Sequence, residues 1–458
     1  MKEKHMTRCF VVFGLSLLGL TQVAQGQTVN MPIVQTKYTA DPAPTVYNDT
    51  VYLYTTHDED DAEGFKMKDW LLYTSTDMVN WQDRGAVASL KDFKWYNGDN
   101  GAWAEQVVVR NGKWYMYCPI HGHGIGVLVS DSPYGPFVDP IGKPLVWEGE
   151  WDDIDPTVWI DDDGQAYLYW GNPTLKSVKL NEDMISTQGE IIHHPHIEDY
   201  QEGPWFYKRK GKYYMAFAST CCPEGIGYAM SDKPLGPWTY KGHIMNHTPR
   251  TRGNHPGIID YKGHSYCFGL NYDIFRLETT RHAERRSVSV AEMKYRKDGT
   301  IEELPYFQDC KLKQLESFNP YRRVEAETMA WGYGLKTEPK QMNGSPRQNQ
   351  IVTHVDDGKY IQLKGVDFKK GASQFEVSAS AHLYGGRIEL HLDGVAGQLL
   401  GQVSITNTQG AYKTFTTKNL TKVSGIHDLY LVFRAADGEA GERQQRNLFN
   451  LDWWRFSE

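Results

Sequence analysis

The sequence lacks the features that nucleic-acid-binding, zinc-finger and membrane-spanning proteins share. Its 458 residues hold 49 Lys and Arg against 57 Asp and Glu, so the net charge is −8 and no basic surplus is available for a phosphate backbone. It has six cysteines, none in the Cys-x-x-Cys spacing of common zinc sites. Beyond residue 26, no apolar run approaches the roughly 18 residues that a membrane span needs. These absences exclude nucleic acid as a partner and favour a globular protein with a neutral partner.

The N-terminus carries the one long apolar stretch. Lys2, Lys4 and Arg8 precede an apolar run at residues 10–20, and small residues follow at 24–26. This order is typical of a secretory signal peptide, here residues 1–26. We therefore expect an exported protein, periplasmic or extracellular, that is a monomer. Five cysteines remain after cleavage, so at least one is unpaired and at most two disulfides form.

An aromatic-rich hairpin pattern occurs five times in the first two thirds of the chain. Each copy joins a turn of Asn, Asp, Gly or Lys type to an alternating strand, and the copies begin at Asn48, Asn111, Asp162, Arg209 and Tyr261. Their spacing of roughly 50 residues is close to the length of one four-stranded propeller blade. The sequence therefore predicts an all-β chain in which residues 27–318 form a five-bladed β-propeller.

An ionisable residue stands shortly before each hairpin turn: Asp41, Glu105, Asp155, Glu202 and His255. The first strand of a blade lines the central channel, so pseudo-symmetry brings these five side chains towards one axis. Converging carboxylates, one kept protonated and one ionised, are the groups that cleave glycosidic bonds. A structural cation or a solvated ion-pair network is the alternative explanation for the same cluster.

Four segments of this region resemble glycoside hydrolase family 43 in their order and spacing. They are TADPAP at residues 39–44, DDIDPTVW at 152–159, YQEGPWFYKRKGKYY at 200–214 and GNHPGIIDYKG at 253–263. The resemblance implies a five-bladed propeller and an inverting mechanism. It makes Asp41 the general base that activates water, Glu202 the general acid, and Asp155 the third carboxylate, which tunes and orients the acid.

The same resemblance implies which residues contact the sugar. Trp103 matches an aromatic residue beside the subsite, where it would stack on a sugar face, although the family often has Pro after this Trp and this chain has Ala. His255 matches an axial histidine that helps to hold a calcium ion or its waters; a neutral, hydrogen-bonded histidine is the alternative. In this family an arginine of the closing blade often reaches the pocket; Arg285 and Arg286 are both candidates, of which we take Arg286, and a buried ion pair is the alternative. With Glu105, these are the expected substrate-binding residues of the propeller.

Residues 319–458 follow a turn signal and alternate short strands with turns, which predicts a β-sandwich of jelly-roll type. This segment resembles carbohydrate-binding module family 6, on RVEAETMAWGYG from residue 323, GKYIQLKGVDF from 358, GGRIELHLDG from 385, GIHDLYLVF from 425 and NLDWWRF from 450. The resemblance makes Glu325, Glu327 and Asp452 ligands of a structural calcium, a cation that prefers oxygen donors. Its sugar site would use Tyr412 and Asn450, with His354 where a Tyr is frequent. A module that only buttresses the propeller is the alternative.

Together these expectations describe an exported inverting glycosidase that removes α-L-arabinofuranosyl branches from arabinoxylan in the plant cell wall. Two alternatives stay open. A β-xylosidase or an exo-acting galactanase keeps the chemistry and changes the sugar. A non-catalytic glycan-binding protein would have no need of three carboxylates in one channel.

Overall fold

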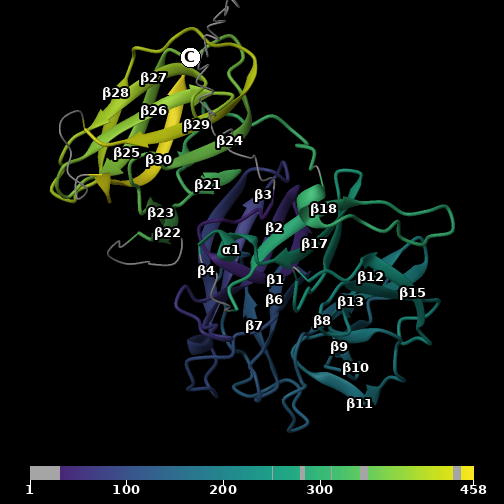
Figure 1. The fold of residues 1–458 in the computed structure, drawn as a ribbon. Coiled ribbons are helices and arrows are strands. Elements are labelled where there is room, and N and C mark those ends of the chain that lie inside the picture. The colour runs from purple at the N-terminus through teal and green to yellow at the C-terminus, as the bar shows by residue number, and fades with distance from the viewer. Residues whose placement is uncertain (1–30, 250, 279–283, 311, 341–348, 437–444) are drawn as a thin grey trace, which may run out of the picture.

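The computed structural model describes residues 31–249, 251–278, 284–310, 312–340, 349–436 and 445–458. The expected signal peptide lies outside the described residues. Within them the chain is almost entirely β-structure, with seven sheets, and Figure 1 shows the strands gathered into two modules. The helical parts described are the short α1 at Asp273–Glu278 and two single 3₁₀ turns at Leu90–Asp92 and Phe307–Asp309. None of the described helices is long and apolar enough to span a membrane.

The N-terminal module contains five antiparallel sheets, each formed by consecutive strands. The first has β1 Tyr38–Tyr47, β2 Thr50–Asp58, β3 Asp69–Ser75 and β4 Trp81–Ser89, and the second has β5 Gln106–Arg110, β6 Lys113–Pro119 and β7 Ile125–Ser130. The third has β8 Thr157–Ile160, β9 Ala166–Trp170, β10 Lys176–Leu180 and β11 Thr187–His193. The fourth has β12 Tyr200–Arg209, β13 Lys212–Ser219, β14 Ile226–Ser231 and β15 Thr239–Met245. The fifth has β16 Gly257–Tyr261, β17 His264–Asn271 and β18 Ser287–Met293.

Each of the five repeated segments forms the first hairpin of its sheet, as the sequence pattern predicts. The hairpin turns fall at residues 48–49, 111–112, 161–165, 210–211 and 262–263. The first strands contact one another in order: β1 touches β5, β5 touches β8, β8 touches β12, β12 touches β16, and β16 touches β1. Of the five predicted ionisable residues, Asp41 and Glu202 are therefore carried on these neighbouring first strands. Glu105, Asp155 and His255 stand one or two residues before theirs.

The C-terminal module consists of two sheets that enclose their own apolar core. One sheet has β22 Lys336–Pro339, β23 Gln350–Thr353, β30 Asn450–Ser457, β25 Gln374–Ser380 and β28 Lys413–Thr417, with β19 Val324–Glu325 paired to β30. The other has β21 Trp331–Tyr333, β24 Tyr360–Asp367, β29 Ile426–Arg434, β26 Gly386–Leu392 and β27 Gln398–Ile405. Phe318 belongs to this core and its amide donates to the Gly365 carbonyl at 2.8 Å, so the second packing unit already begins at this residue.

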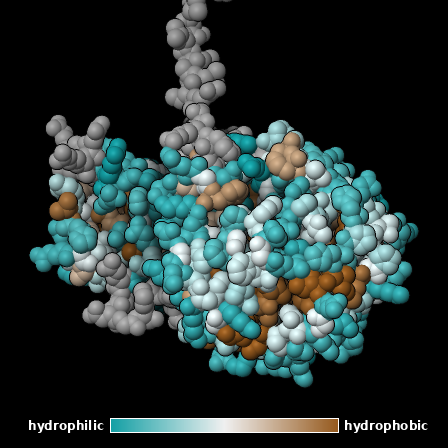
Figure 2. Space-filling model, turned by 90° about the horizontal axis from the view of Figure 1, so that it is seen from below, coloured by the Kyte–Doolittle hydropathy of each residue, from teal (hydrophilic) through white to brown (hydrophobic). Residues whose placement is uncertain are grey.

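The two modules share backbone hydrogen bonds. β20 Thr328–Met329, which follows the first strand of the C-terminal module, pairs with β4 and becomes the fifth strand of the first sheet. The Asn80 side chain accepts from the Lys364 amide at 2.9 Å and donates to the Lys364 carbonyl at 3.0 Å. Figure 2 shows a surface that is hydrophilic over most of both modules, with its largest hydrophobic area on the larger, N-terminal module.

Candidate active site

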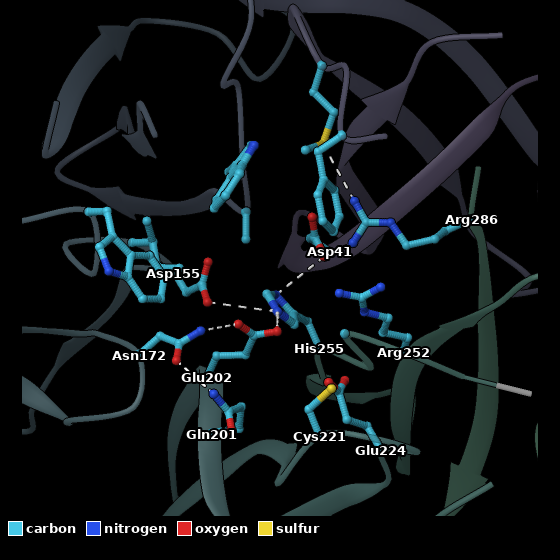
Figure 3. Close-up of a pocket in the computed structure, with 17 residues that line it drawn as sticks. Asp41, Asp155, Asn172, Gln201, Glu202, Cys221, Glu224, Arg252, His255 and Arg286 are labelled. Carbon is cyan, nitrogen blue, oxygen red and sulfur yellow. Dashed lines mark hydrogen bonds and ion pairs between the residues drawn. The ribbon is translucent and has the colours of Figure 1, made fainter. Parts of the chain in front are cut away.

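A cavity of about 270 Å³ opens where the first strands of the N-terminal module meet. Figure 3 shows carboxylates from three different sheets pointing towards one histidine, His255, within it. Aromatic side chains and polar groups from loops complete the wall of the cavity. The lining residues are Asp41, Phe65, Met67, Trp103, Ala104, Trp151, Ile154, Asp155, Asn172, Gln201, Glu202, Cys221, Glu224, Arg252, Gly253, His255 and Arg286. The three predicted catalytic carboxylates thus share one cavity.

Asp41 lies at a bulge near the start of β1, where the pairing with β2 shifts register between Ala40 and Ala43. A bulge re-aims a side chain out of the regular alternation, and the φ of +50° at Asp41 is part of this local geometry. The carboxylate is buried and accepts from Thr56 Oγ1 at 2.9 Å and from Arg286 at 3.1 Å. These two donors bind one carboxylate oxygen each and so fix the orientation of the Asp41 side chain.

Asp155 shares the positive φ of Asp41, at +58°, and lies two residues before the first strand of the third sheet. It is buried and accepts from the Gly203 amide at 3.0 Å. Burial raises the pKa of Asp155 to about 7; the charges of Glu202 and Asp41 add to the rise, while the charge of His255 opposes it. Asp155 therefore changes charge near neutral pH.

Glu202 lies on β12, at a point where the pairing with β13 shifts register on both sides. Its side chain is 20% exposed, more than those of Asp41 and Asp155, and it faces the cavity. Asn172 donates a hydrogen bond to one oxygen, and His255 Nε2 lies 3.5 Å from the other. Glu202 is thus the carboxyl of the three that is best placed to reach a bound molecule.

His255 lies between the three carboxylates. Its Nδ1 is 3.3 Å from Asp41, and its Nε2 is 3.5 Å from Glu202 and 3.8 Å from Asp155. Burial alone would lower the pKa of His255, but the charges of Asp155, Asp41 and Glu202 overcome it and raise the pKa to about 10. The carboxylate charges around His255 thus favour its protonated form.

Glu105 lies deeper, beside a small cavity of about 20 Å³ that it shares with Asp41, Asp155 and His255. Both carboxylate oxygens are buried and receive no hydrogen bond from another described residue. Burial raises the pKa of Glu105 well above its usual range, and the Asp41 charge raises it further. A buried carboxylate with two unpartnered oxygens, in a space large enough for one water-sized group, fits a cation such as calcium.

Trp103 and Arg286 both line the cavity. The Trp103 ring stacks on His121, with centroids 3.9 Å apart, and leaves an aromatic wall at the mouth. Arg286 is buried, donates to both Asp58 oxygens at 2.9 Å and extends to Asp41. It therefore holds the expected base rather than projecting freely into the opening.

The predicted residues of the C-terminal module are spread over one end of its first sheet. Tyr412 hydrogen-bonds Asn450, and the Lys340 ammonium lies 4.3 Å from the Tyr412 ring centre. His354 is exposed near Thr353 Oγ1, at 3.1 Å. Tyr412 and Asn450 are thus in contact, and sugar binding by them stays a prediction.

The three expected calcium ligands of the C-terminal module have different interaction partners. Glu325 pairs with Arg323 at 2.7 Å, and Asp452 accepts from Lys340 at 2.7 Å and from Asn349 at 3.1 Å. Glu327 is buried with Oε2 unpartnered, and burial raises its pKa well above the usual range. The three do not gather at ligand distance among the described side chains, so calcium binding here stays a prediction.

Comparison with known proteins assigns both modules of the chain to families. Residues 29–301 match the profile of the glycosyl hydrolases family 43, and residues 325–458 match that of carbohydrate binding module family 6. The chain belongs to glycosyl hydrolase family 43. As a member of this family with a complete set of three carboxylates in its cavity, it is an enzyme that hydrolyses glycosidic bonds.

The relatives of this family 43 chain include proteins that match it across the residues of both modules. An arabinoxylan arabinofuranohydrolase of Paenibacillus polymyxa is 33% identical over 93% of this chain and 74% of its own length. One from Bacillus subtilis (strain 168) is 31% identical over 96% of this chain and 94% of its own. The crystal structure of a Bacillus subtilis arabinoxylan arabinofuranohydrolase in complex with cellotetraose superimposes with a TM-score of 0.81, at 30% identity, over 94% of this chain and 97% of that one.

Several cavity residues were not predicted from the sequence. Asn172 follows β9, Cys221 and Glu224 follow β13, and Phe65 follows β2. Each lies in the loop between the second and third strands of a sheet. Because neighbouring strands are antiparallel, this loop is at the same end as the start of the first strand. The repeat pattern therefore indicates these loops as part of the site, whereas the sequence-based prediction considered only the first strands.

Glu224 is the most unusual of these residues. It is buried, and Oε2 accepts from the Asn254 amide at 3.0 Å. Burial raises the pKa of Glu224 to about 7, and the Glu202 charge contributes to the rise. Besides the three predicted carboxyls, the cavity therefore contains a fourth, Glu224, which burial keeps easier to protonate than an exposed Glu.

Proposed function

We propose that this chain is an exported, inverting α-L-arabinofuranosidase that removes arabinofuranosyl branches from arabinoxylan. The observation that carries the proposal is the likeness to arabinoxylan arabinofuranohydrolases across both modules, combined with Asp41, Asp155 and Glu202 in one cavity. Relatives named as xylosidases, such as the xylosidase/arabinosidase of Bacteroides ovatus, match 59% of this chain. The two-module likeness favours arabinoxylan over xylo-oligosaccharides.

In this proposal the five sheets are the blades of a closed propeller. The ring of contacts between the five first strands supports closure, as do two backbone hydrogen bonds that join β1 and the segment before it to β18 and the residue before it. These bonds run from the Ile33 amide to the Val288 carbonyl at 3.0 Å and from the Thr39 amide to the Arg286 carbonyl at 2.9 Å. A closed ring keeps carboxylates from separate blades at fixed separations, which acid–base catalysis requires.

The roles of the three carboxyls follow from how exposed each side chain is and from where each lies around His255. Glu202, the most exposed of the three carboxyls, protonates the glycosidic oxygen of the leaving xylose. Asp41, held by Arg286 and Thr56, takes a proton from the water that attacks the anomeric carbon. Asp41 and Glu202 contact opposite nitrogens of one imidazole. This arrangement supports a gap that admits water, as inverting enzymes need.

Asp155 and His255 adjust the charge around the acid. Asp155 binds the amide of Gly203, the residue next to Glu202, and so orients the strand that carries the acid. The His255 imidazolium offsets the negative charge of three carboxylates in a buried space. Calcium held at Glu105, beneath His255, would supply further positive charge to the floor of the cavity.

The remaining assignments belong to the same proposal. Residues 1–26 direct export and are removed, residues 27–318 form the catalytic propeller, and residues 319–458 form the carbohydrate-binding sandwich. Tyr412 and Asn450 bind a sugar of the polysaccharide there, and Glu325, Glu327 and Asp452 hold calcium when it is present.

The test is the identity of the sugar released by the purified protein from arabinoxylan, arabinan, xylo-oligosaccharide and arabinogalactan. Arabinose released from arabinoxylan, and absent with the Glu202→Ala variant, supports the proposal. Release of xylose or galactose would instead support a β-xylosidase or an exo-acting galactanase. No release from any polymer would favour a glycan-binding protein.

A further inference from the structure

Cys221 and Cys222 form a disulfide between adjacent residues in the loop that joins β13 to β14. Both residues are exposed, whereas the unpaired Cys118 and Cys267 are buried. Cys221 lines the cavity that holds the three carboxylates, and Figure 3 shows it beside Glu224, on the side of His255 away from Asp41. The disulfide therefore lies at the mouth of the active site.

The loop does not depend on this disulfide for its position. The two ends of the loop are joined to each other, since the Gly225 amide donates to Ser219 Oγ at 2.7 Å and the Ser219 amide donates to the Gly225 carbonyl at 3.2 Å. Each end is also held from outside the loop: the Thr220 amide donates to Asp199 at 3.2 Å, and the Glu224 carbonyl accepts from Thr251 Oγ1 at 2.9 Å. These bonds fix both ends of the loop from outside the cysteine pair.

A disulfide between neighbours also adds little to global stability. Disulfides stabilise a fold mainly by restricting the unfolded chain, and the effect grows with the number of residues in the closed loop. Here the sequence separation is one residue. The consequence of the bond is therefore local: it joins two thiols into a single rigid surface at the cavity mouth.

That surface has the chemistry of a sugar-contacting wall. Two bonded sulfurs are polarizable and carry no hydrogen-bond donor, whereas two thiols would be separate, rotatable donors. The other apolar walls of the cavity are Phe65, Trp103 and Trp151, of which Trp151 is 52% exposed. Carbohydrate rings present C–H faces that pack on such surfaces, while the polar groups of the cavity bind their hydroxyls.

We propose that the Cys221–Cys222 disulfide is a substrate-binding wall that contacts the xylan sugar carrying the branch to be cleaved. The assignment of this sugar rests on the proposed function. Because both cysteines are exposed at the mouth, the wall meets the part of the substrate outside the deep pocket. It therefore sets affinity for the polymer rather than the rate of bond cleavage.

The test compares the wild type with the Cys221→Ser/Cys222→Ser double variant on arabinoxylan and on an aryl α-L-arabinofuranoside, which has no xylan chain. We expect KM for arabinoxylan to rise about tenfold, with kcat and the KM for the aryl glycoside within twofold. Cys310→Ser, which removes an unpaired cysteine outside the cavity, should match the wild type on both substrates.

Reduction of the wild type provides a second route that needs no folding of a variant. A phosphine converts the disulfide and one water into two thiols and the phosphine oxide, and a thiol count shows that two thiols have formed. The same rise in KM for arabinoxylan, reversed on reoxidation, supports the wall. An unchanged KM for the polymer, or an equal loss of kcat on both substrates, overturns it.

Binding separates a failure of this proposal from a failure of the proposed function. The dissociation constant for an arabinose-branched xylo-oligosaccharide is measured on Glu202→Ala with and without the two cysteine substitutions. A tenfold weaker binding without the disulfide supports the wall, and equal binding overturns it. No arabinose from the untreated wild type contradicts the proposed function instead.

Discussion

At the residue scale, the central feature is a group of three carboxylates arranged around one imidazole. Their positions could be predicted because each stands at the equivalent place in a repeated hairpin, and a repeat carries three-dimensional information that a single Asp-Pro does not. Their charge states could not be predicted, since burial and mutual distance determine them. Asp155 and Glu224 both have pKa values raised to about 7, and only the structure shows why.

Glu202→Ala should reduce kcat on arabinoxylan by about 10²–10⁴-fold, because the leaving xylose then departs without a proton donor. The loss should be much smaller on an aryl arabinofuranoside with an acidic phenol, which leaves without protonation. Glu198→Ala removes an exposed carboxyl four residues earlier and should keep wild-type rates on both substrates. Equal losses on both substrates would contradict the role of Glu202 as the acid.

His255 should make stability depend on pH in the alkaline range. Its pKa is raised to about 10 in the folded protein from 6.5 in the unfolded chain. The folded state therefore keeps a proton that the unfolded state loses, so its contribution is complete below about pH 6.5 and lost as pH rises towards 10. In chelator, the free energy of unfolding of the wild type should fall more steeply between pH 6.5 and 9 than that of His255→Asn. Parallel slopes would show that His255 is not charged.

At the scale of elements, the hairpins were predictable and the loops between second and third strands were not. The hairpins follow from turn residues and alternating aromatics, which are local signals. The repeat places the loops that carry Asn172, Cys221 and Glu224 at one end of the sheets, but these loops differ in length and composition, so their sequences do not show which residues enter the cavity. The disulfide between the neighbours Cys221 and Cys222 could not be predicted either, because cysteine spacing alone does not give connectivity.

Gly203 provides a test of how tightly the first strands approach one another. Its φ is +58°, and a Cβ added there would lie 2.7 Å from the His255 ring. Gly203→Ala should therefore displace His255 and the neighbouring Glu202 and reduce activity by at least about 100-fold, a size in keeping with a 1 Å misplacement.

Gly211→Ala is the matched control in the same hairpin. It has a φ of +75° with open space around the position of a Cβ. It should lower the melting temperature through backbone strain of about 1 kcal/mol without changing kcat. Full activity in Gly203→Ala would contradict the close contact with His255.

At the scale of the whole molecule, the two modules were predictable and their connection was not. The turn signal predicts a boundary at residue 319, but it gives no reason for β20 to extend the first sheet. Thr337 of the second module also donates to Asp83 of the first at 2.5 Å. The sandwich is therefore attached to the first sheet by specific bonds.

Asn80→Ala should weaken this attachment, since it removes both hydrogen bonds to the Lys364 backbone. We expect a loss of about 1–3 kcal/mol and, in calorimetry, a single unfolding transition that broadens or divides in two. Asn181→Ala removes comparable side-chain bonds within the third sheet and should lower stability while keeping one transition. Division of the transition in both variants would contradict coupling through Asn80.

The most direct measurement of the whole account is proton NMR during hydrolysis of arabinoxylan by the wild-type protein. An inverting enzyme that cleaves α-L-arabinofuranosyl branches must first release β-L-arabinofuranose, before mutarotation, while the xylan chain stays intact. Appearance of the β-anomer first, with loss of the branch resonances, is the predicted result. The α-anomer first, or release of xylose in its place, would contradict the account.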